Sequence, residues 1–388
     1  MSNSIAAATI PLSLYVHIPW CVRKCPYCDF NSHPVEGGMD EARYVDALLA
    51  DLAFEAPLVK GRVIQSIFFG GGTPSLFAAE SIGRIIAAAE QQIGLTSDCE
   101  ITLEANPGAA EQARFRAYRA AGVNRLSIGV QSFDSTALQK LGRIHSGDEA
   151  IAAAGMAHAA GIDNFNLDLM FALPEQNLDT ARTDLEQAIA LAPAHISYYQ
   201  LTLEPGTHFH RHPPTLPDHE LAWTMQQQGE EILAAAGYAQ YEVSAYAQTD
   251  KQCRHNLNYW LFGDYLGIGA GAHGKLSTQN LIQRRARARM PKHFMARAGD
   301  ETVLSESLSV ESHDRVFEFL LNALRIKQGF AIADFCRNTG LPVTWLNTAL
   351  ADCLQRQLLT IDADWVKTTA LGWRHLDGIL AELLPEAA

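Results

Sequence analysis

The sequence lacks a long apolar run, an excess of positive charge and a dense set of cysteines. No apolar stretch approaches the ~20 residues that a membrane-spanning helix needs, which argues against a transmembrane protein. Lys and Arg number 30 against 43 Asp and Glu, and the net charge of -13 argues against a sequence-independent nucleic-acid binder. Seven cysteines in 388 residues, an odd number at low density, exclude a secreted disulfide scaffold.

The overall composition is that of a globular protein and not of a disordered one. A hydrophobic share of 48% and a charged share of 19% predict one large domain or two smaller ones. The opening stretch MSNSIAAATIPLSLYVHI lacks the basic start and small-residue cleavage site of a signal peptide. We therefore expect a cytoplasmic protein whose cysteines serve a purpose other than disulfide bonding.

Short β-branched apolar stretches alternate with amphipathic helical patterns as far as about His210. Strands are predicted to begin near Leu12, Ile64, Glu100, Arg125, Asn164 and His195, with helices over residues 41–54, 79–92, 110–121 and 179–191 between them. This alternation indicates βαβ units and a parallel sheet. The predicted fold class is α/β, with six units in an open, partial TIM-type (β/α) barrel; an open doubly wound sheet is the alternative.

Beyond His210 the alternation stops at a proline-rich segment. A long helix is predicted over residues 218–236, followed by a strand in YAQYEVSAYA and the glycine-rich run GDYLGIGAGAHG. The basic segment 284–293 is predicted to be a surface connection, and the chain after about Ser305 to form helices, a short strand pair and a final helix. We therefore divide the chain into the barrel (1–237), a connecting region (238–300) and a smaller, mostly helical, winged-helix-like domain (301–388).

Three of the seven cysteines, Cys21, Cys25 and Cys28, lie together in WCVRKCPYCDF. They follow the first predicted strand, at the end of a parallel barrel where functional sites are built. A closed structural zinc site needs four protein ligands, whereas three thiolates on an iron–sulfur cluster leave one iron open to a chelating ligand. The alternatives are zinc completed by His17 or His33, and a chance cluster of structural cysteines.

The spacing C-x3-C-x2-C, with Tyr27 before the last cysteine, resembles the signature of the radical S-adenosylmethionine (SAM) superfamily. The resemblance implies that Cys21, Cys25 and Cys28 hold a 4Fe-4S cluster and that SAM chelates its fourth iron. It also implies that the reduced cluster can split SAM into methionine and a 5′-deoxyadenosyl radical.

Glycines and polar residues at later strand ends extend this resemblance. Residues 70–74, GGGTP, would let the backbone approach a ligand closely, or form a plain strand-to-helix turn. A buried carboxylate such as Asp168 needs a partner, so a structural ion pair with Arg143 is the alternative to ligand binding. In order and sequence these segments resemble the coproporphyrinogen-oxidase-like branch of the superfamily. That resemblance implies SAM contacts by Tyr15, Tyr27, Gly71, Gly72, Thr73, Glu104, Gln131, Arg143 and Asp168.

Two sub-families share the core of this branch. One is an oxygen-independent coproporphyrinogen III dehydrogenase, with a further cysteine two residues after the third cluster cysteine, where this chain has Phe30. The other is a heme chaperone with an H-N-x-x-Y-W motif, which residues 255–260, HNLNYW, match. The resemblance therefore implies a heme chaperone that delivers heme to apo-hemoproteins of the respiratory chain; the dehydrogenase is the alternative.

The HNLNYW segment offers an imidazole for heme iron and aromatic rings for the porphyrin face. The candidate heme-binding residues are His255, Asn256, Tyr259 and Trp260. His273 and Cys253 are rival iron ligands, and a histidine beside Tyr and Trp can also be a hydrogen-bonded core residue.

Two further groups complete the inventory. The basic residues Arg284, Arg285, Arg287, Arg289 and Lys292 predict a solvated positive face, with contact to heme propionates or to anionic lipid as the alternative. Of the remaining cysteines, Cys99, Cys336 and Cys353 are predicted to be small core residues, and Cys253 has no assigned role.

Overall fold

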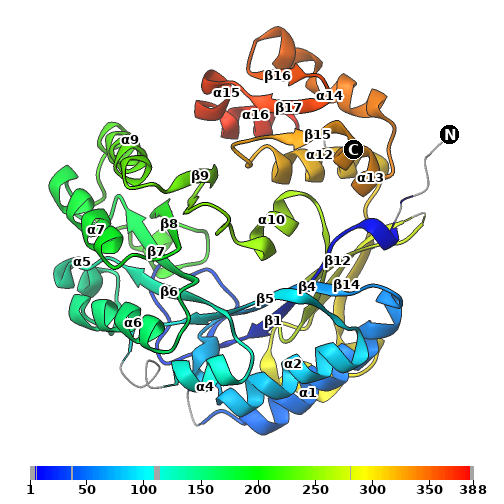
Figure 1. Cartoon of the computed structure of the whole chain (residues 1–388), viewed down its shortest axis with the longest axis horizontal. Coiled ribbons are helices and arrows are strands. Elements are labelled where there is room, and N and C mark those ends of the chain that lie inside the picture. Colours follow the sequence, from blue (N-terminus) through cyan, green and yellow to red (C-terminus); the bar gives the residue numbers. More distant parts are fainter. Residues whose placement is uncertain (1–4, 6, 36–37, 109–113, 280, 385–388) are drawn as a thin grey trace.

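The computed structural model describes residues 5, 7–35, 38–108, 114–279 and 281–384, and shows an α/β protein built on one large curved sheet (Figure 1). The sheet has 12 strands in the order β14-β13-β12-β11-β1-β4-β5-β6-β7-β8-β10-β9. Its centre is a run of parallel strands: β1 (Leu12–Ile18), β4 (Ile64–Gly71), β5 (Leu95–Ala105), β6 (Arg125–Gln131), β7 (Phe165–Phe171) and β8 (His195–Gln200). These match the six predicted strands. Their order follows the chain without the reversal of a doubly wound sheet, so the partial-barrel prediction is confirmed.

Amphipathic helices cover the outer side of this curve (Figure 1). They are α1 (Glu41–Glu55), α2 (Ala79–Gln92), α4 (Phe115–Ala120), α5 (Ser135–Lys140), α6 (Gly147–Ala159), α7 (Leu178–Ala190) and α9 (His219–Ala235). Of the helix predicted over 110–121, residues 110–113 lie outside the described part of the chain. Among the residues that are described, no helix combines the length and the apolar character needed to cross a bilayer.

The region after α9 extends the sheet at both ends. β9 (Ala239–Glu242) and β10 (Ala245–Ala247) join β8, while β11 (Asp264–Ile268) runs parallel to β1 and continues into antiparallel β12 (His273–Ser277), β13 (Ile282–Arg287) and β14 (Leu304–Ser309). The basic segment was predicted to be a surface connection, and this is wrong. It forms β13 and then α11 (Pro291–Arg297), because acidic residues of α1 compensate its buried charges.

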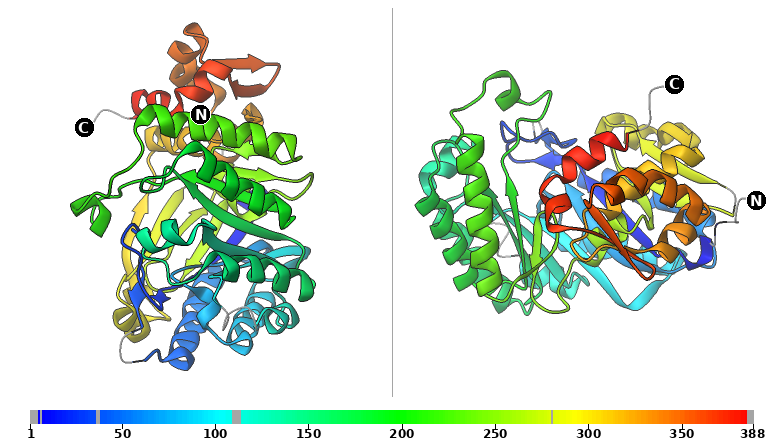
Figure 2. Two further views of the ribbon diagram at one scale, coloured as in Figure 1. Left: turned by 90° about the vertical axis from the view of Figure 1, so that its left-hand side faces the viewer. Right: turned by 90° about the horizontal axis from the view of Figure 1, so that it is seen from above.

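The C-terminal elements form a smaller, mostly helical part with its own apolar core, which packs on α10 (Arg254–Trp260) at the open side of the curved sheet (Figures 1 and 2). They are α12 (Ser312–Ala323), β15 (Phe330–Ala331), α13 (Ile332–Thr339), α14 (Val343–Gln355), β16 (Leu359–Asp362), β17 (Trp365–Thr368), α15 (Ala370–Arg374) and α16 (Leu376–Glu382). The predicted helices, strand pair and final helix are therefore present. The division of the chain after residues 237 and 300 stays a prediction.

Short elements complete the chain. They are β2 (Trp20–Cys21), β3 (His33–Pro34), α8 (His208–Arg211), α10 (Arg254–Trp260) and the 3-10 turns Ala7–Thr9, Ala56–Val59, Pro74–Leu76 and Glu301–Val303. Helix α10 matters most for the site, because it lies inside the curve and packs against β1, β4, β11 and α12 (Figure 1).

Candidate functional site

The cysteine loop leaves β1 at the carboxyl end of the parallel strands. Strand β2 pairs with β3 and closes the base of the loop. The Lys24 ammonium ties the loop further by donating to the carbonyls of Phe30 (2.9 Å) and Ser32 (3.2 Å). All three cysteines are free, half-buried and line one cavity of about 570 Å³. Burial raises the pKa of the Cys21 and Cys28 thiols, so metal binding there must displace protons.

Two glycines bring the end of β4 against this loop. Gly71 has φ +116°, and a Cβ there would meet the His17 ring at 2.5 Å. A Cβ at Gly72 would collide with the backbone of Trp20. The Gly71 N–H donates to Glu104 Oε2 at 3.1 Å, which holds the carboxyl at the end of β5 over the cavity. Glycine is therefore required here for close backbone packing beside the thiols.

The ends of the next strands line the same cavity. Gln131 has φ +69°, a left-handed conformation that is uncommon outside glycine, and its Oε1 accepts a hydrogen bond from Tyr199 at 2.8 Å. The cavity brings together Cys21, Cys25, Cys28, Tyr27, Gly71, Gly72, Thr73, Glu104, Gln131, Arg143 and Asp168. Of the residues predicted to contact the cluster or SAM, Tyr15 alone lies elsewhere, in an adjoining cavity.

Arg143 points at the cysteine loop and not at the carboxylates. Its Nη2 donates to the Gly129 carbonyl (2.6 Å) and to Asn106 Oδ1 (2.8 Å), and its Nη1 lies 3.7 Å from Cys25 Sγ. Asp168 instead accepts hydrogen bonds from Ser127 Oγ (3.1 Å) and Asn166 Nδ2 (2.8 Å). The structural ion pair between Arg143 and Asp168 is therefore not formed, and the guanidinium supplies positive charge beside the thiols.

The hydrogen bonds of His17 argue against a zinc site that this histidine would complete. The His17 ring is fully engaged, with Nδ1 bonded to Tyr15 Oη (3.0 Å) and Nε2 bonded to the Asn31 carbonyl (2.9 Å). His17 therefore has no lone pair left to complete a zinc site. Within the described ranges, no three His, Cys, Asp or Glu side chains gather closely enough for a single metal ion.

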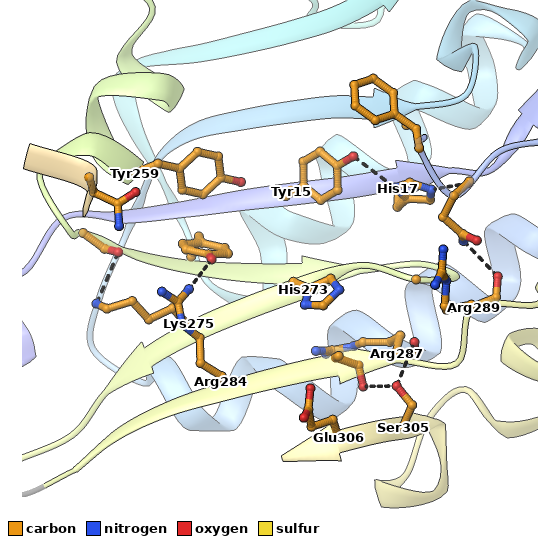
Figure 3. Close-up of a pocket in the computed structure, with 18 of the residues that line it drawn as sticks. Tyr15, His17, Tyr259, His273, Lys275, Arg284, Arg287, Arg289, Ser305 and Glu306 are labelled. Carbon is orange, nitrogen blue, oxygen red and sulfur yellow. Dashed lines mark hydrogen bonds between the residues drawn. The ribbon is translucent and has the colours of Figure 1, made fainter. Parts of the chain in front are cut away.

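A second cavity of about 730 Å³ adjoins the first, and Phe30, Gly71, Glu104 and Trp260 line both. Its volume lies within the range of about 300–1,000 Å³ typical of small-molecule sites. Helix α10 contributes Tyr259 and Trp260 to its lining, and the neighbouring sheet strands β1, β11, β12 and β13 contribute Tyr15, Tyr265, His273 and Arg284. Figure 3 shows Tyr15, Tyr259, His273 and Arg284 around this space.

The HNLNYW segment forms α10, and only part of it faces a cavity. His255 is 1% exposed and lines neither cavity; its Nδ1 is bonded to Ser66 Oγ (3.1 Å) and its Nε2 to Tyr259 Oη (2.8 Å). Burial and the positive charge of Arg125 lower the pKa of His255 to about 3. Tyr259 lines the 730 Å³ cavity, Asn256 lines the cysteine cavity, and Trp260 lines both.

A buried carboxylate anchors the start of α10. Glu100 accepts the backbone N–H groups of Arg254 and His255, both at 3.2 Å, and lies 3.6 Å from Cys253 Sγ. Cys253 is fully buried and lines neither cavity. Cys99 and Cys353 are buried as predicted, while Cys336 is half-buried against the C-terminal core.

The basic segment is largely neutralised, so the prediction of a solvated positive face is wrong for most of it. Arg287 is fully buried against Asp51 (3.2 Å) and Glu55 (2.8 Å), and Arg285 also pairs with Glu55 at 2.8 Å. Arg284 pairs with Glu318 of α12 and donates to Tyr265 Oη. The acidic partners lie far away in the sequence, so local composition could not reveal them.

Asn31 fastens the cysteine loop, a contact that the sequence reasoning missed. It lies three residues after Cys28, and its Nδ2 donates to the carbonyls of Ala270 and Arg289, both at 2.9 Å. The cysteine loop is thereby fastened to the strands that wall the second cavity. A polar residue just beyond the third cysteine was the available signal.

Glu104→Gln is expected to remove a pH dependence of stability. Burial and the charge of Asp168 raise the pKa of Glu104 from 4.5 to about 8. A carboxyl whose pKa is higher in the folded chain stabilises that chain at low pH and loses this contribution as pH rises toward 8. Denaturant unfolding of the SAM-free chain should show wild type losing roughly 1–3 kcal/mol between pH 5 and pH 9 relative to the variant. The substitution Glu90→Gln at an exposed position is the control. The prediction would be contradicted if the free energy of unfolding changed with pH to the same extent in wild type and both variants.

The partial barrel and the three-thiol loop at its carboxyl end define a radical SAM protein. A family model described as the radical SAM superfamily matches residues 15–188, and one described as the HemN C-terminal domain matches residues 310–375. Heme chaperone HemW of Escherichia coli is 46% identical over 97% of this chain and 99% of its own length. Heme chaperone HemW of Haemophilus influenzae is 46% identical over 97% of this chain and 98% of its own.

More distant relatives share the architecture. The mitochondrial radical S-adenosyl methionine domain-containing protein 1 of Mus musculus is 34% identical over 98% of this chain and 89% of its own. The solved structure of Escherichia coli coproporphyrinogen III oxidase, HemN, has a TM-score of 0.81 at 22% identity, covering 97% of this chain and 91% of that one. The chain therefore belongs to the HemW family of radical SAM proteins, and this membership implies a 4Fe-4S cluster and SAM.

Proposed function

We propose that this protein is a heme chaperone that binds heme in the 730 Å³ cavity, next to a SAM-ligated 4Fe-4S cluster. The observation that carries the proposal is the pairing of the two cavities. One is lined by three thiols and polar strand ends, and the other, which shares Glu104 and Trp260 with it, is walled by aromatic rings. The names of the HemW relatives support heme as the cargo.

The cysteine cavity is the proposed cluster and SAM site. Cys21, Cys25 and Cys28 would hold the cluster, which when bound supplies an open iron for the amino and carboxylate groups of SAM. Glu104 and Asp168 offer acceptors, and Arg143 offers positive charge, to the polar groups of that ligand. Tyr27, Gly71, Gly72, Thr73 and Gln131 complete the proposed SAM contacts in this cavity. Tyr15, which lines the adjoining cavity, also remains a proposed SAM contact.

Helix α10 is the proposed aromatic wall for the porphyrin. Tyr259 and Trp260 face the cavity, and the buried indole Nε1 of Trp260 has no hydrogen-bond partner among the described residues. His255 holds Tyr259 in place through the 2.8 Å bond to its hydroxyl. Asn256 lies on the side of the cluster, so HNLNYW spans the wall between the two cavities.

The proposed cluster and the proposed heme cargo indicate where the protein acts and on which partners. An oxygen-sensitive cluster requires a reducing compartment, so we place the protein in the cytoplasm. Its heme recipients would be apo-hemoproteins of the respiratory chain. The exposed side chain of Lys292 is available for peripheral contact with an anionic membrane.

Hemin titration of the anaerobically reconstituted full chain tests the function. We expect a saturable Soret band, and no conversion of coproporphyrinogen III when the same protein is incubated with SAM and a reductant. His255→Ala should weaken hemin binding about tenfold, because Tyr259 loses the hydrogen bond that holds it. The exposed substitution His158→Ala on α6 should change nothing. Absence of a Soret band, or enzymatic turnover of coproporphyrinogen III, would overturn the proposal.

A further inference from the structure

His273 opens β12 on the cavity side of the sheet. Side chains alternate along a strand, so His273 shares its face with Lys275, and both line the 730 Å³ cavity. Figure 3 shows the His273 ring near the centre of the group, between Arg284 and Lys275 on one side and Arg287 and Arg289 on the other. The side chain is exposed to this space.

The His273 ring differs from the other histidines near the cavities. His17 and His255 each have both ring nitrogens hydrogen-bonded, whereas within the described part of the chain no hydrogen bond reaches the His273 ring. Partial burial, together with the nearby arginines, lowers the pKa of His273 against an opposing effect of Glu306. A neutral imidazole with a free nitrogen is the form that binds a metal.

The other candidate iron ligand of this region is inaccessible. Cys253 is 0% exposed, lies 3.6 Å from Glu100 Oε1 and lines neither cavity. Burial raises the pKa of its thiol to about 12, which disfavours the thiolate that iron would need. His273 is therefore the accessible nitrogen donor, with the Tyr15 and Tyr259 rings as neighbours in the same cavity.

A second requirement of heme is a partner for its propionate carboxylates. The cationic side chains that line this cavity are Lys275, Arg284, Arg287 and Arg289. Ion pairs occupy Lys275 (Asp264, 2.9 Å), Arg284 (Glu318) and Arg287 (Glu55). Among the described residues Arg289 has no ion pair, and its side chain is exposed. Its backbone is held in place because Asn31 donates to its carbonyl at 2.9 Å.

We propose that His273 supplies the axial nitrogen to the heme iron and that Arg289 binds a propionate. The inference rests on the heme-binding function proposed above and assigns the polar contacts of that site. His255 then acts as a positioning residue for Tyr259, and the rings of Tyr259 and Trp260 together with residues of β12 and β13 would line the bound porphyrin.

Spectroscopy of the hemin-loaded, cluster-reconstituted full chain separates these roles. His273→Ala should shift the Soret maximum and abolish the imidazole-type electron paramagnetic resonance signal of the ferric heme. Added imidazole should restore that signal. His255→Ala should keep the wild-type spectrum with weaker binding. His293→Ala, an exposed histidine of the neighbouring α11 that lines neither cavity, is the matched control and should match wild type in both spectrum and affinity.

The propionate contact has its own test. Arg289→Gln should raise the Kd for hemin about tenfold, as expected for the loss of a charge-assisted hydrogen bond, without changing the spectrum. The variant should bind the dimethyl ester of protoporphyrin as well as wild type does, because the ester lacks the carboxylates. Lys292→Gln, the neighbouring exposed cation, is the control.

The outcomes distinguish this inference from the function it rests on. If wild type binds hemin and His273→Ala leaves its spectrum unchanged, His273 is not the ligand, while the chaperone function stands. If Arg289→Gln loses affinity for hemin and for the dimethyl ester equally, the propionate contact is overturned. If the wild-type chain binds no hemin, both the function and the inference fall.

Discussion

Cys21→Ser is expected to reduce the iron and acid-labile sulfide of the reconstituted protein to background. The three thiols of the loop line one cavity, so removing one leaves two for a cluster that already has an open iron. A serine hydroxyl is a poor substitute because iron–sulfur clusters are held by thiolates. The broad visible absorption of the cluster should disappear together with the iron. Quantitative iron and sulfide analysis after anaerobic reconstitution measures the effect.

Cys336→Ser is the matched control for this experiment. Cys336 is also free and half-buried, but it lies in α13 against the C-terminal core. The variant should retain full iron and sulfide content. Equal metal loss in both variants, or retention of the cluster in Cys21→Ser, would contradict the assignment of the loop.

The cysteine loop also connects the two proposed ligand sites. Phe30 lines both cavities, and Asn31 bridges the loop to the backbone of Arg289. If a bound cluster orders the loop, it should therefore also order the residues that line the heme cavity. Because binding linkage is reciprocal, heme and SAM should change each other's affinity by the same factor.

The barrel could be predicted from the sequence because its strands are buried on both faces. A stretch such as LSLYVHI is nearly continuous in apolar residues, and β1 is formed from this stretch. The three thiols could also be found, since they lie within eight residues and follow a strand. Local sequence patterns were sufficient to predict those features whose residues are close together in the chain.

The parts that were missed depend on contacts between distant segments. The sequence predicted that the charged residues 284–287 lie on the surface. Asp51 and Glu55 neutralise two of these charges but lie more than 200 residues earlier in the chain; Arg285 and Glu55, for example, are 230 residues apart. The sequence makes His255 a candidate metal ligand, and it could not show that both ring nitrogens are hydrogen-bonded, to Ser66 and Tyr259. Hydrogen-bond saturation of a side chain can be seen only once the fold has brought its partners together.

Asp264→Asn is expected to destabilise the protein by roughly 3–5 kcal/mol, because it leaves a buried cation without its counter-charge. Asp264 is 0% exposed and accepts hydrogen bonds from Lys275 Nζ (2.9 Å), Arg62 Nη1 (2.7 Å) and Ser277 Oγ (2.8 Å). Lys275 is itself 1% exposed. Denaturant unfolding at neutral pH measures the loss, and Asp46→Asn, which breaks an exposed pair with Arg84, should cost little.

The pH dependence gives the same prediction a second, independent readout. Burial alone would raise the pKa of Asp264, but Lys275 and Arg62 outweigh burial and hold it below its usual value of 3.8. A carboxylate with a lowered folded-state pKa contributes stability above its unfolded pKa and loses it as pH falls. The difference in free energy of unfolding between wild type and Asp264→Asn should therefore be largest at neutral pH and should decrease below about pH 4. A loss smaller than about 1 kcal/mol would mean that the Phe262 carbonyl, 3.0 Å from Lys275 Nζ, suffices as its acceptor, so that the ion pair contributes little.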